Sequence, residues 1–256
     1  MRPSIQHSEN ENLPWGVRSV VSVWLIWLAL AFASRVLLDV YTAFAPLRFL
    51  GAMSAQTLRG TSLTPGILVA AALLIPTLIV TGIAFRMVAA RYQGAPLQAL
   101  AFTRLNPVWV LAVVVLLGVL LAFFLRFALG RTGYLLPLLE PPVGFYNAFD
   151  LWLYTVSVPV TALLAGLFVF GFCYPILVAR LGVWAGGLLC AVFFTLPQLA
   201  VQGLHWQPAA ALLAMGVYLT AVRLRTGSTY TATLGYTGFS VYIALSVALA
   251  ELAVSA

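Results

Sequence analysis

Few side chains in this sequence could do acid–base or metal chemistry, and they are widely separated. Among 256 residues there are two histidines, two cysteines and six acidic residues. His7 and His205 lie nearly 200 residues apart, and Cys173 and Cys190 lie inside apolar segments, where thiols are usually inert packing residues. A zinc site needs three or four Cys, His or acidic ligands, and the sequence has no such cluster. We therefore predict no cofactor, no metal centre and no catalytic residue.

The composition of the chain indicates a membrane protein. Hydrophobic residues make up 63% and charged residues only 7%, against about 45–50% and 25% in soluble domains. A soluble fold of this size could not bury so much apolar surface, so lipid must solvate much of it. The net charge of +7 comes from 13 cationic residues, all of them Arg. These do not form a basic run or an aromatic-interleaved basic patch, so we predict no nucleic-acid binding.

Seven apolar segments are long enough, or nearly long enough, to span a bilayer. A helix rises 1.5 Å per residue, so about 20 residues cross a hydrocarbon core of roughly 30 Å. The predicted spans are residues 19–34, 66–85, 108–125, 151–178, 183–198, 209–222 and 229–250. We predict an all-α, polytopic transmembrane bundle of about seven spans, forming one membrane domain over residues 1–256. Residues 1–150 hold the N-terminal spans and residues 151–250 a four-helix core.

Several local signals refine these spans. Asn106 and Pro107 open the third span as a cap residue followed by proline, and Ser228 is placed to cap the seventh. Arg35 and Asp39 are four residues apart and can pair on a helix. Two intervening segments, residues 41–64 and 132–150, mix apolar and polar residues, which predicts interfacial segments, or for 41–64 a re-entrant one. The fourth span carries Pro159 and Pro175, which predict a tilt or a kink.

The interior of the spans is almost free of ionisable groups. Segments two to seven contain no Asp, Glu, Arg, Lys or His between their ends. Proton-coupled transporters use intramembrane acids, and Ser–His catalysis needs a base beside its nucleophile, so both classes are disfavoured. With seven spans, eight arginines fall on the side of the N-terminus and five on the other side. This asymmetry predicts a cytoplasmic N-terminus, and we expect the membrane to be a bacterial inner membrane.

Small residues recur four positions apart in the later spans, a spacing that lets helix backbones approach closely. Internal packing of the bundle is the simpler interpretation for most of them, and contact with a second protein is the alternative. The pairs are Ala162 and Gly166, Gly187 and Ala191, Thr231 and Gly235, and Ser240 and Ala244.

From about residue 165 to residue 244 the chain resembles the CPBP family of intramembrane metalloproteases, also called CAAX-protease-like or Abi proteins. Residues 171–185, with the sequence GFCYPILVARLGVWA, are similar to the family's first-motif helix and the turn after it. Residues 194–198, FTLPQ, are similar to the second motif, and residues 225–230, RTGSTY, to the turn that leads into the last motif helix. The resemblance covers about a third of the chain.

The resemblance also implies that the family's chemistry is lost. Its Glu-Glu pair falls on Ala165 and Gly166, and its first-motif Arg falls on Phe170. The remaining motif positions, two histidines and an asparagine in the family, are Gln198, Tyr236 and Ser240. These residues cannot assemble a water-activating metal site. The resemblance thus implies a degenerate, non-catalytic member whose remnant cavity would be lined by Phe170, Phe194, Gln198, Tyr236 and Ser240.

Two functions remain open from the sequence. The first is a pseudoprotease that acts as a scaffold or accessory subunit and binds another integral membrane protein. The second is a membrane protein that uses the remnant cavity to bind a lipid, an isoprenoid or a pigment. In both cases membrane lipids are expected to surround the chain.

Overall fold

The structure, a computed structural model, describes residues 15–50, 65–92, 96–102, 105–130, 148–202 and 206–255. Within these ranges the chain is helical, with no strand, which confirms the all-α prediction. The elements are α1 (Val17–Leu50), α2 (Pro65–Arg91), α3 (Pro96–Ala99), α4 (Val108–Gly130), α6 (Ala148–Gly166), the π-helix η2 (Leu167–Cys173), α7 (Tyr174–Gln202), α8 (Trp206–Thr226) and α9 (Thr229–Ser255).

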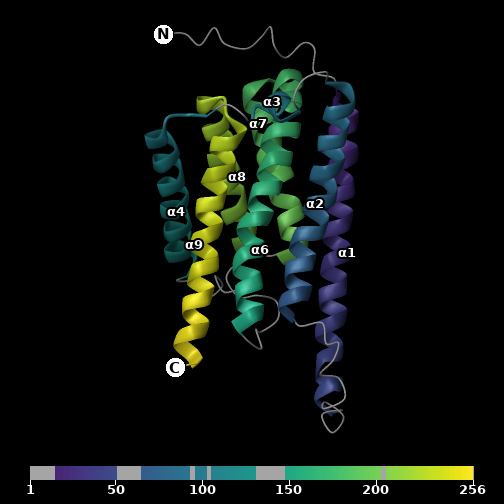
Figure 1. Cartoon of the computed structure of the whole chain (residues 1–256), viewed down its shortest axis with the longest axis vertical. Coiled ribbons are helices and arrows are strands. Elements are labelled where there is room, and N and C mark those ends of the chain that lie inside the picture. Colours follow the sequence, from purple (N-terminus) through teal and green to yellow (C-terminus); the bar gives the residue numbers. More distant parts are fainter. Residues whose placement is uncertain are drawn as a thin grey trace.

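The long helices lie side by side along the long axis of the molecule, and α1 begins at the end of the bundle opposite to the one where α9 ends (Figure 1). Helix α9 packs against α4, α6 and α8, while α7 packs against α1 and α8. Helix α2 lies between α1 and α6, and α4 sits at one side of the bundle, mainly against α9 (Figure 1). The largest cluster of buried apolar side chains joins residues of all the long helices and η2.

Five stretches in the described ranges are long and apolar enough to cross a membrane. They are Val17–Val40, Ile67–Arg91, Val108–Leu125, Trp152–Val201 and Pro208–Thr226. Their number and length indicate an integral membrane protein with a helical bundle.

The 50-residue stretch Trp152–Val201 is folded back on itself. Gly182 has φ = 78°, which glycine adopts readily, and it interrupts the helical backbone of α7. A Cβ added at Gly186 would lie 2.5 Å from the carbonyl oxygen of Leu177, so the chain after Gly182 returns along the chain before it. The reversal falls between the predicted segments 151–178 and 183–198.

Helix α1 is longer than predicted. Its backbone continues through Leu50, so residues 41–50 extend this helix rather than begin a separate interfacial segment. Thirty-four residues at about 1.5 Å each exceed the thickness of a hydrocarbon core, so a helix can continue past the bilayer when no breaker stops it. Residues 51–64 of that predicted segment, and residues 132–147 of the second one, lie outside the described ranges; residues 148–150 form the first turn of α6.

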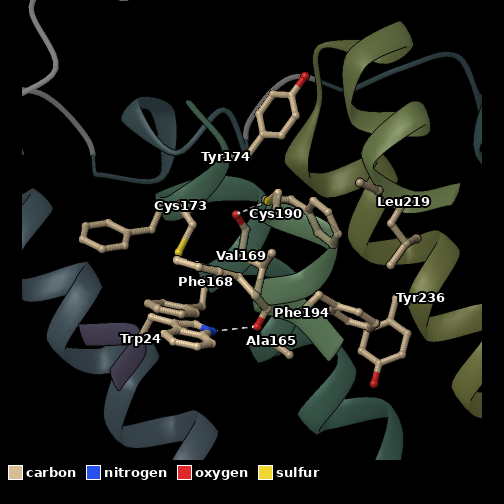
Figure 2. Packing of buried hydrophobic residues seen from close by; sticks show 14 of the residues in the cluster. Trp24, Ala165, Phe168, Val169, Cys173, Tyr174, Cys190, Phe194, Leu219 and Tyr236 are labelled. Carbon is tan, nitrogen blue, oxygen red and sulfur yellow. Dashed lines mark hydrogen bonds between the residues drawn. The ribbon is translucent and has the colours of Figure 1, made fainter. Parts of the chain in front are cut away.

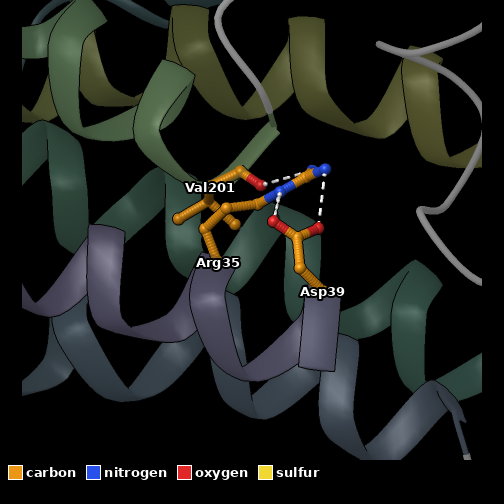
Figure 3. Close-up of polar contacts among 3 residues, drawn as sticks. All are labelled: Arg35, Asp39 and Val201. Atoms are coloured by element: carbon orange, nitrogen blue, oxygen red, sulfur yellow. Dashed lines mark hydrogen bonds and ion pairs between the residues drawn. The ribbon is translucent and has the colours of Figure 1, made fainter. Parts of the chain in front are cut away.

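Two of the predicted local contacts are present. Ser228 Oγ accepts a hydrogen bond from the backbone N–H of Thr231 at 3.2 Å, which confirms the cap of α9. Arg35 and Asp39 form a two-point ion pair on α1 with N–O distances of 2.9 and 3.0 Å (Figure 3). The side-chain N–H of Asn106, just before α4, donates to Thr231 Oγ1 on α9 at 2.7 Å, a contact that was not predicted.

Glycines bring α4 and α9 close together. A Cβ added at Gly118 on α4 would collide with the carbonyl oxygen of Gly235 on α9, and one added at Gly238 would lie 2.9 Å from the carbonyl oxygen of Val115. Helix association in membranes depends on such close backbone approach, because lipid supplies no hydrophobic driving force between helices.

Replacing Gly118 by Ala should therefore push α4 away from α9. We expect Gly118→Ala to lower the free energy of unfolding by about 1–3 kcal/mol, the usual range for overpacking. Gly82→Ala on α2 is the matched control, because nothing lies within 4 Å of its added Cβ. Thermal unfolding of both purified variants in the same detergent measures the difference, and equal melting temperatures would show that the α4–α9 contact is not close.

Candidate functional site

The structure brings together residues from the three stretches that resemble the CPBP motifs. The rings of Phe170 and Phe194 lie 6.1 Å apart, and Phe194 meets Tyr236 edge to face with ring centroids 4.8 Å apart. Ala165 lies beside Phe194 and Tyr236 in the same buried cluster (Figure 2). These residues come from α6, η2, α7 and α9, so segments up to 70 residues apart in sequence converge on one region.

Every one of these motif positions is buried. Gly166 lies against Thr233, whose Oγ1 would be 2.7 Å from a Cβ added at the glycine. Tyr236 and Ser240 share a side-chain hydrogen bond on α9. Gln198 is 5% exposed, one turn beyond Phe194 on α7. The space between the motif positions therefore contains neutral side chains, and three aromatic rings occupy much of it.

This set of side chains offers no acid, base or metal ligand of ordinary strength. Its polar groups are two hydroxyls and one amide, on Tyr236, Ser240 and Gln198. No group of three or more His, Cys, Asp or Glu side chains that could hold a metal ion occurs within the described ranges. The region can exchange hydrogen bonds with a neutral group, but it has no means to ionise water.

The backbone just before α7 departs from α-helical geometry. In η2 the N–H of Tyr174 bonds to the carbonyl of Val169, five residues earlier, which is the π-helical spacing. The next residue, Pro175, has no N–H and cannot bond to the carbonyl of Phe170 in the same way. The Phe170 carbonyl therefore needs a donor from elsewhere, because an unpaired backbone group inside a membrane is costly.

Helix α8 supplies that donor. Arg223 Nε donates to the Phe170 carbonyl at 3.2 Å. Thr229 Oγ1 on α9 lies 3.1 Å from the same oxygen and 2.7 Å from the Leu100 carbonyl, so its single proton serves mainly the closer one. Arg223 is buried, and its guanidinium carbon lies 5.3 Å from the ring centroid of Tyr174, close enough for a cation–π contact. A buried cation thus lies at the backbone of Phe170, the position that the resemblance aligns with the motif arginine.

The neighbouring carbonyls of η2 also bind side chains from other elements. Trp15 Nε1, just before α1, donates to the Phe172 carbonyl at 3.1 Å, and its ring stacks on that of Phe172. Cys190 Sγ on α7 donates to the Val169 carbonyl at 3.5 Å (Figure 2). We call the carbonyls of Val169, Phe170 and Phe172 the η2 carbonyls. Through them η2 is linked to the chain before α1 and to α7, α8 and α9.

The small residues that were predicted as packing positions contact neighbouring helices of the same chain. A Cβ added at Gly187 would lie 2.9 Å from Thr220 on α8, and one added at Gly216 on α8 would lie 3.0 Å from Ala191. Gly235 lies against Val114 on α4. The other positions, Ala162, Thr231 and Ala244, are buried.

Sequence analysis did not identify the η2 carbonyls or the role of Arg223. Arg223 was counted only as an orientation signal, although it stands beside Arg225 and only Arg223 is buried. The sequence signal for the unpaired carbonyl was Pro175, which we took only as a sign of a tilt or a kink. A proline inside an apolar helix also leaves a carbonyl without its donor, and a nearby arginine on another helix is a candidate to bind it.

Removing the guanidinium of Arg223 should destabilise the bundle more than removing that of Arg225. We expect Arg223→Gln to lower the free energy of unfolding by about 1.5–3 kcal/mol, the range for a hydrogen bond to a charged group. Arg225→Gln is the control, because Arg225 is exposed on the same helix. Thermal unfolding in one detergent measures both, and a similar change for the two variants would contradict the role given to Arg223.

Comparison of the chain with protein-family models, curated proteins and solved structures found no match in any of the three.

Proposed function

We propose that this chain is a non-catalytic relative of the CPBP intramembrane metalloproteases that works as a scaffold or accessory subunit for another integral membrane protein. The observation that carries the proposal is the convergence of the three motif-like stretches on one buried region. Phe194 contacts both Phe170 and Tyr236, which come from the other two stretches. This helix arrangement, with neutral residues at the positions aligned with metal ligands, fits a protein that has kept the fold of a protease and lost its catalytic residues.

The proposal includes seven membrane passes. Five stretches are apolar and long enough, and the reversal at Gly182 divides one of them into two passes. Helix α9, at 27 residues, would be the seventh. An odd number of passes agrees with α1 beginning at one end of the bundle and α9 ending at the other (Figure 1).

The proposed orientation has the N-terminus in the cytoplasm of a bacterium. Arg18, Arg91 and Arg225 lie near the ends of α1, α2 and α8 that share the end of the bundle where α1 begins. Arg180 lies near the reversal of α7 at that end. A surplus of arginine at one end of a membrane bundle favours the cytoplasmic side.

A partner would have to bind the outer surface of the bundle. The small residues Gly166, Gly187 and Gly235 already contact helices of the same chain, so they do not provide a free face. Helix α4 contacts α9 and, to a lesser extent, α8, and leaves a wide apolar face. Its most exposed large side chains are Val108, Trp109, Phe123, Phe124 and Phe127. Lipid or a transmembrane helix can cover such a face.

Purification of the tagged full-length chain from its native membrane in a mild detergent tests the proposal. We expect a second integral membrane protein to co-purify in fixed stoichiometry, as identified by mass spectrometry. Elution of the chain alone, or with only a lipid or a pigment, would contradict a scaffold role.

The same preparation tests the absence of catalysis. We expect Gln198→Ala and Tyr236→Ala to cause no loss of proteolysis of a membrane-embedded substrate, measured with and without added zinc. Gln98→Ala on α3 is a control, because Gln98 is exposed and far from the motif positions in sequence. A zinc-dependent activity that either Gln198→Ala or Tyr236→Ala abolishes, while Gln98→Ala keeps it, would rule out the pseudoprotease.

A further inference from the structure

One hydroxyl in the bundle interior lacks a hydrogen-bond partner. Thr161 on α6 is 4% exposed, and within the described ranges its Oγ1 is the one fully buried side-chain nitrogen or oxygen without a partner. Other threonines in the bundle avoid this by bonding to their own helix. Thr77 donates to the Leu73 carbonyl at 3.0 Å, and Thr195 donates to that of Ala191 at 2.8 Å. An orphan hydroxyl in a membrane interior needs a physical explanation.

Thr161 faces the interior of the bundle. Successive residues of a helix are rotated by about 100°, so the exposed side chains of α6 mark its outer face. These side chains are Trp152, Val156, Val160 and Leu163. Thr161 lies on the opposite side of the helix, one turn from the fully buried Ala165.

Two further polar residues lie at the same level of the bundle. Ala165, Phe194 and Tyr236 form one layer of the interior (Figure 2). Thr161 is one turn before Ala165, and α6 runs antiparallel to α9 and to the second half of α7, as the contacts of Gly166 with Thr233 and of Cys190 with Val169 indicate.

Residues one turn after Phe194 and Tyr236 are therefore displaced to the same side as Thr161. They are Gln198 and Ser240, which are 5% and 3% exposed. The Tyr236 hydroxyl also points to this side, away from Cys190 and Leu219 (Figure 2). The helical register thus places four buried polar side chains at one level of the bundle, next to the layer of Phe194 and Tyr236. We call them the polar layer: Thr161, Gln198, Tyr236 and Ser240.

The chemistry of the polar layer limits what it can bind. All four side chains are neutral, so a charged ligand would remain uncompensated. Together they offer three hydroxyls and an amide, which can both donate and accept. Buried water binds where two to four such groups converge and would otherwise be unsatisfied.

We propose that the polar layer binds a buried water molecule that accepts or donates hydrogen bonds at Thr161 Oγ1 and at the amide of Gln198. The water joins α6 to the second half of α7, and the Tyr236–Ser240 pair closes the site from α9. This site does not depend on the proposed scaffold function, since it concerns only the interior of the bundle.

The direction in which Thr161→Val changes the melting temperature distinguishes this proposal from an interior without bound water. If Thr161 binds a water that Gln198 shares, Thr161→Val leaves that water with fewer partners and should lower the melting temperature by about 2–4 °C. If the hydroxyl is unpaired, the same change removes a buried polar group and raises the melting temperature. Thr161→Ser keeps the hydroxyl and should melt near the native value. Thr195→Val is the matched control, because that hydroxyl bonds only within its own helix.

A double-mutant cycle then tests whether the two side chains share one ligand. We expect the combined shift of Thr161→Val with Gln198→Met to be smaller than the sum of the single shifts, whereas Thr161→Val and Thr195→Val should be additive. A high-resolution density map of the native protein should show a peak within hydrogen-bonding distance of Thr161 Oγ1 that is absent in Thr161→Val. Any one of three results would overturn the proposal. They are an unchanged or raised melting temperature for Thr161→Val, additive shifts with Gln198→Met, and the absence of the density peak.

Discussion

The arrangement of this bundle depends on how the carbonyl groups of η2 are satisfied. A membrane interior supplies no water to pair with a free backbone group, so each unpaired carbonyl there is costly. The π-helical turn and Pro175 together leave the Phe170 carbonyl without an intrahelical donor. Arg223 on α8 donates to it, and Thr229 Oγ1 on α9 lies between this oxygen and the Leu100 carbonyl, so α8 and α9 must both lie beside η2.

The same constraint links η2 to two other parts of the chain. Trp15, just before α1, binds the Phe172 carbonyl, and Cys190, on the second half of α7, binds the Val169 carbonyl. The aromatic contacts between Phe170, Phe194 and Tyr236 lie next to this set of hydrogen bonds. If the proposed relationship to the CPBP family holds, these contacts would keep the frame together without metal ligands.

Most of the helices could be predicted from the sequence, because a long apolar segment with few helix breakers satisfies its backbone hydrogen bonds in lipid by forming a helix. It also predicted the Ser228 cap and the Arg35–Asp39 pair, since both depend on short, fixed spacings along one helix. It did not predict the extension of α1 through Leu50, because hydropathy marks where a helix meets lipid and not where the helix ends.

Tertiary contacts explain the remaining differences. The side-chain N–H of Asn106 binds Thr231 on α9, and nothing in the local sequence indicates that partner. The π-helix lies in an apolar run with no local signal except the proline that follows it. The orphan hydroxyl of Thr161 could not be recognised either, because six other threonines of the spans bond to their own helix and the sequence does not distinguish them.

Phe170, Phe194 and Tyr236 converge from three separate stretches of the chain, and we propose that they mark the remnant of a metal site. Restoring three ligands tests it most directly, with the changes Ala165→Glu, Gln198→His and Tyr236→His in one chain. Titration with cobalt(II) should then give about one bound ion per chain with the visible absorption of a tetrahedral site, and the native protein and the single variants should give none. A triple variant that folds, as judged by helical circular dichroism and a cooperative melt, yet binds no cobalt would contradict the claim.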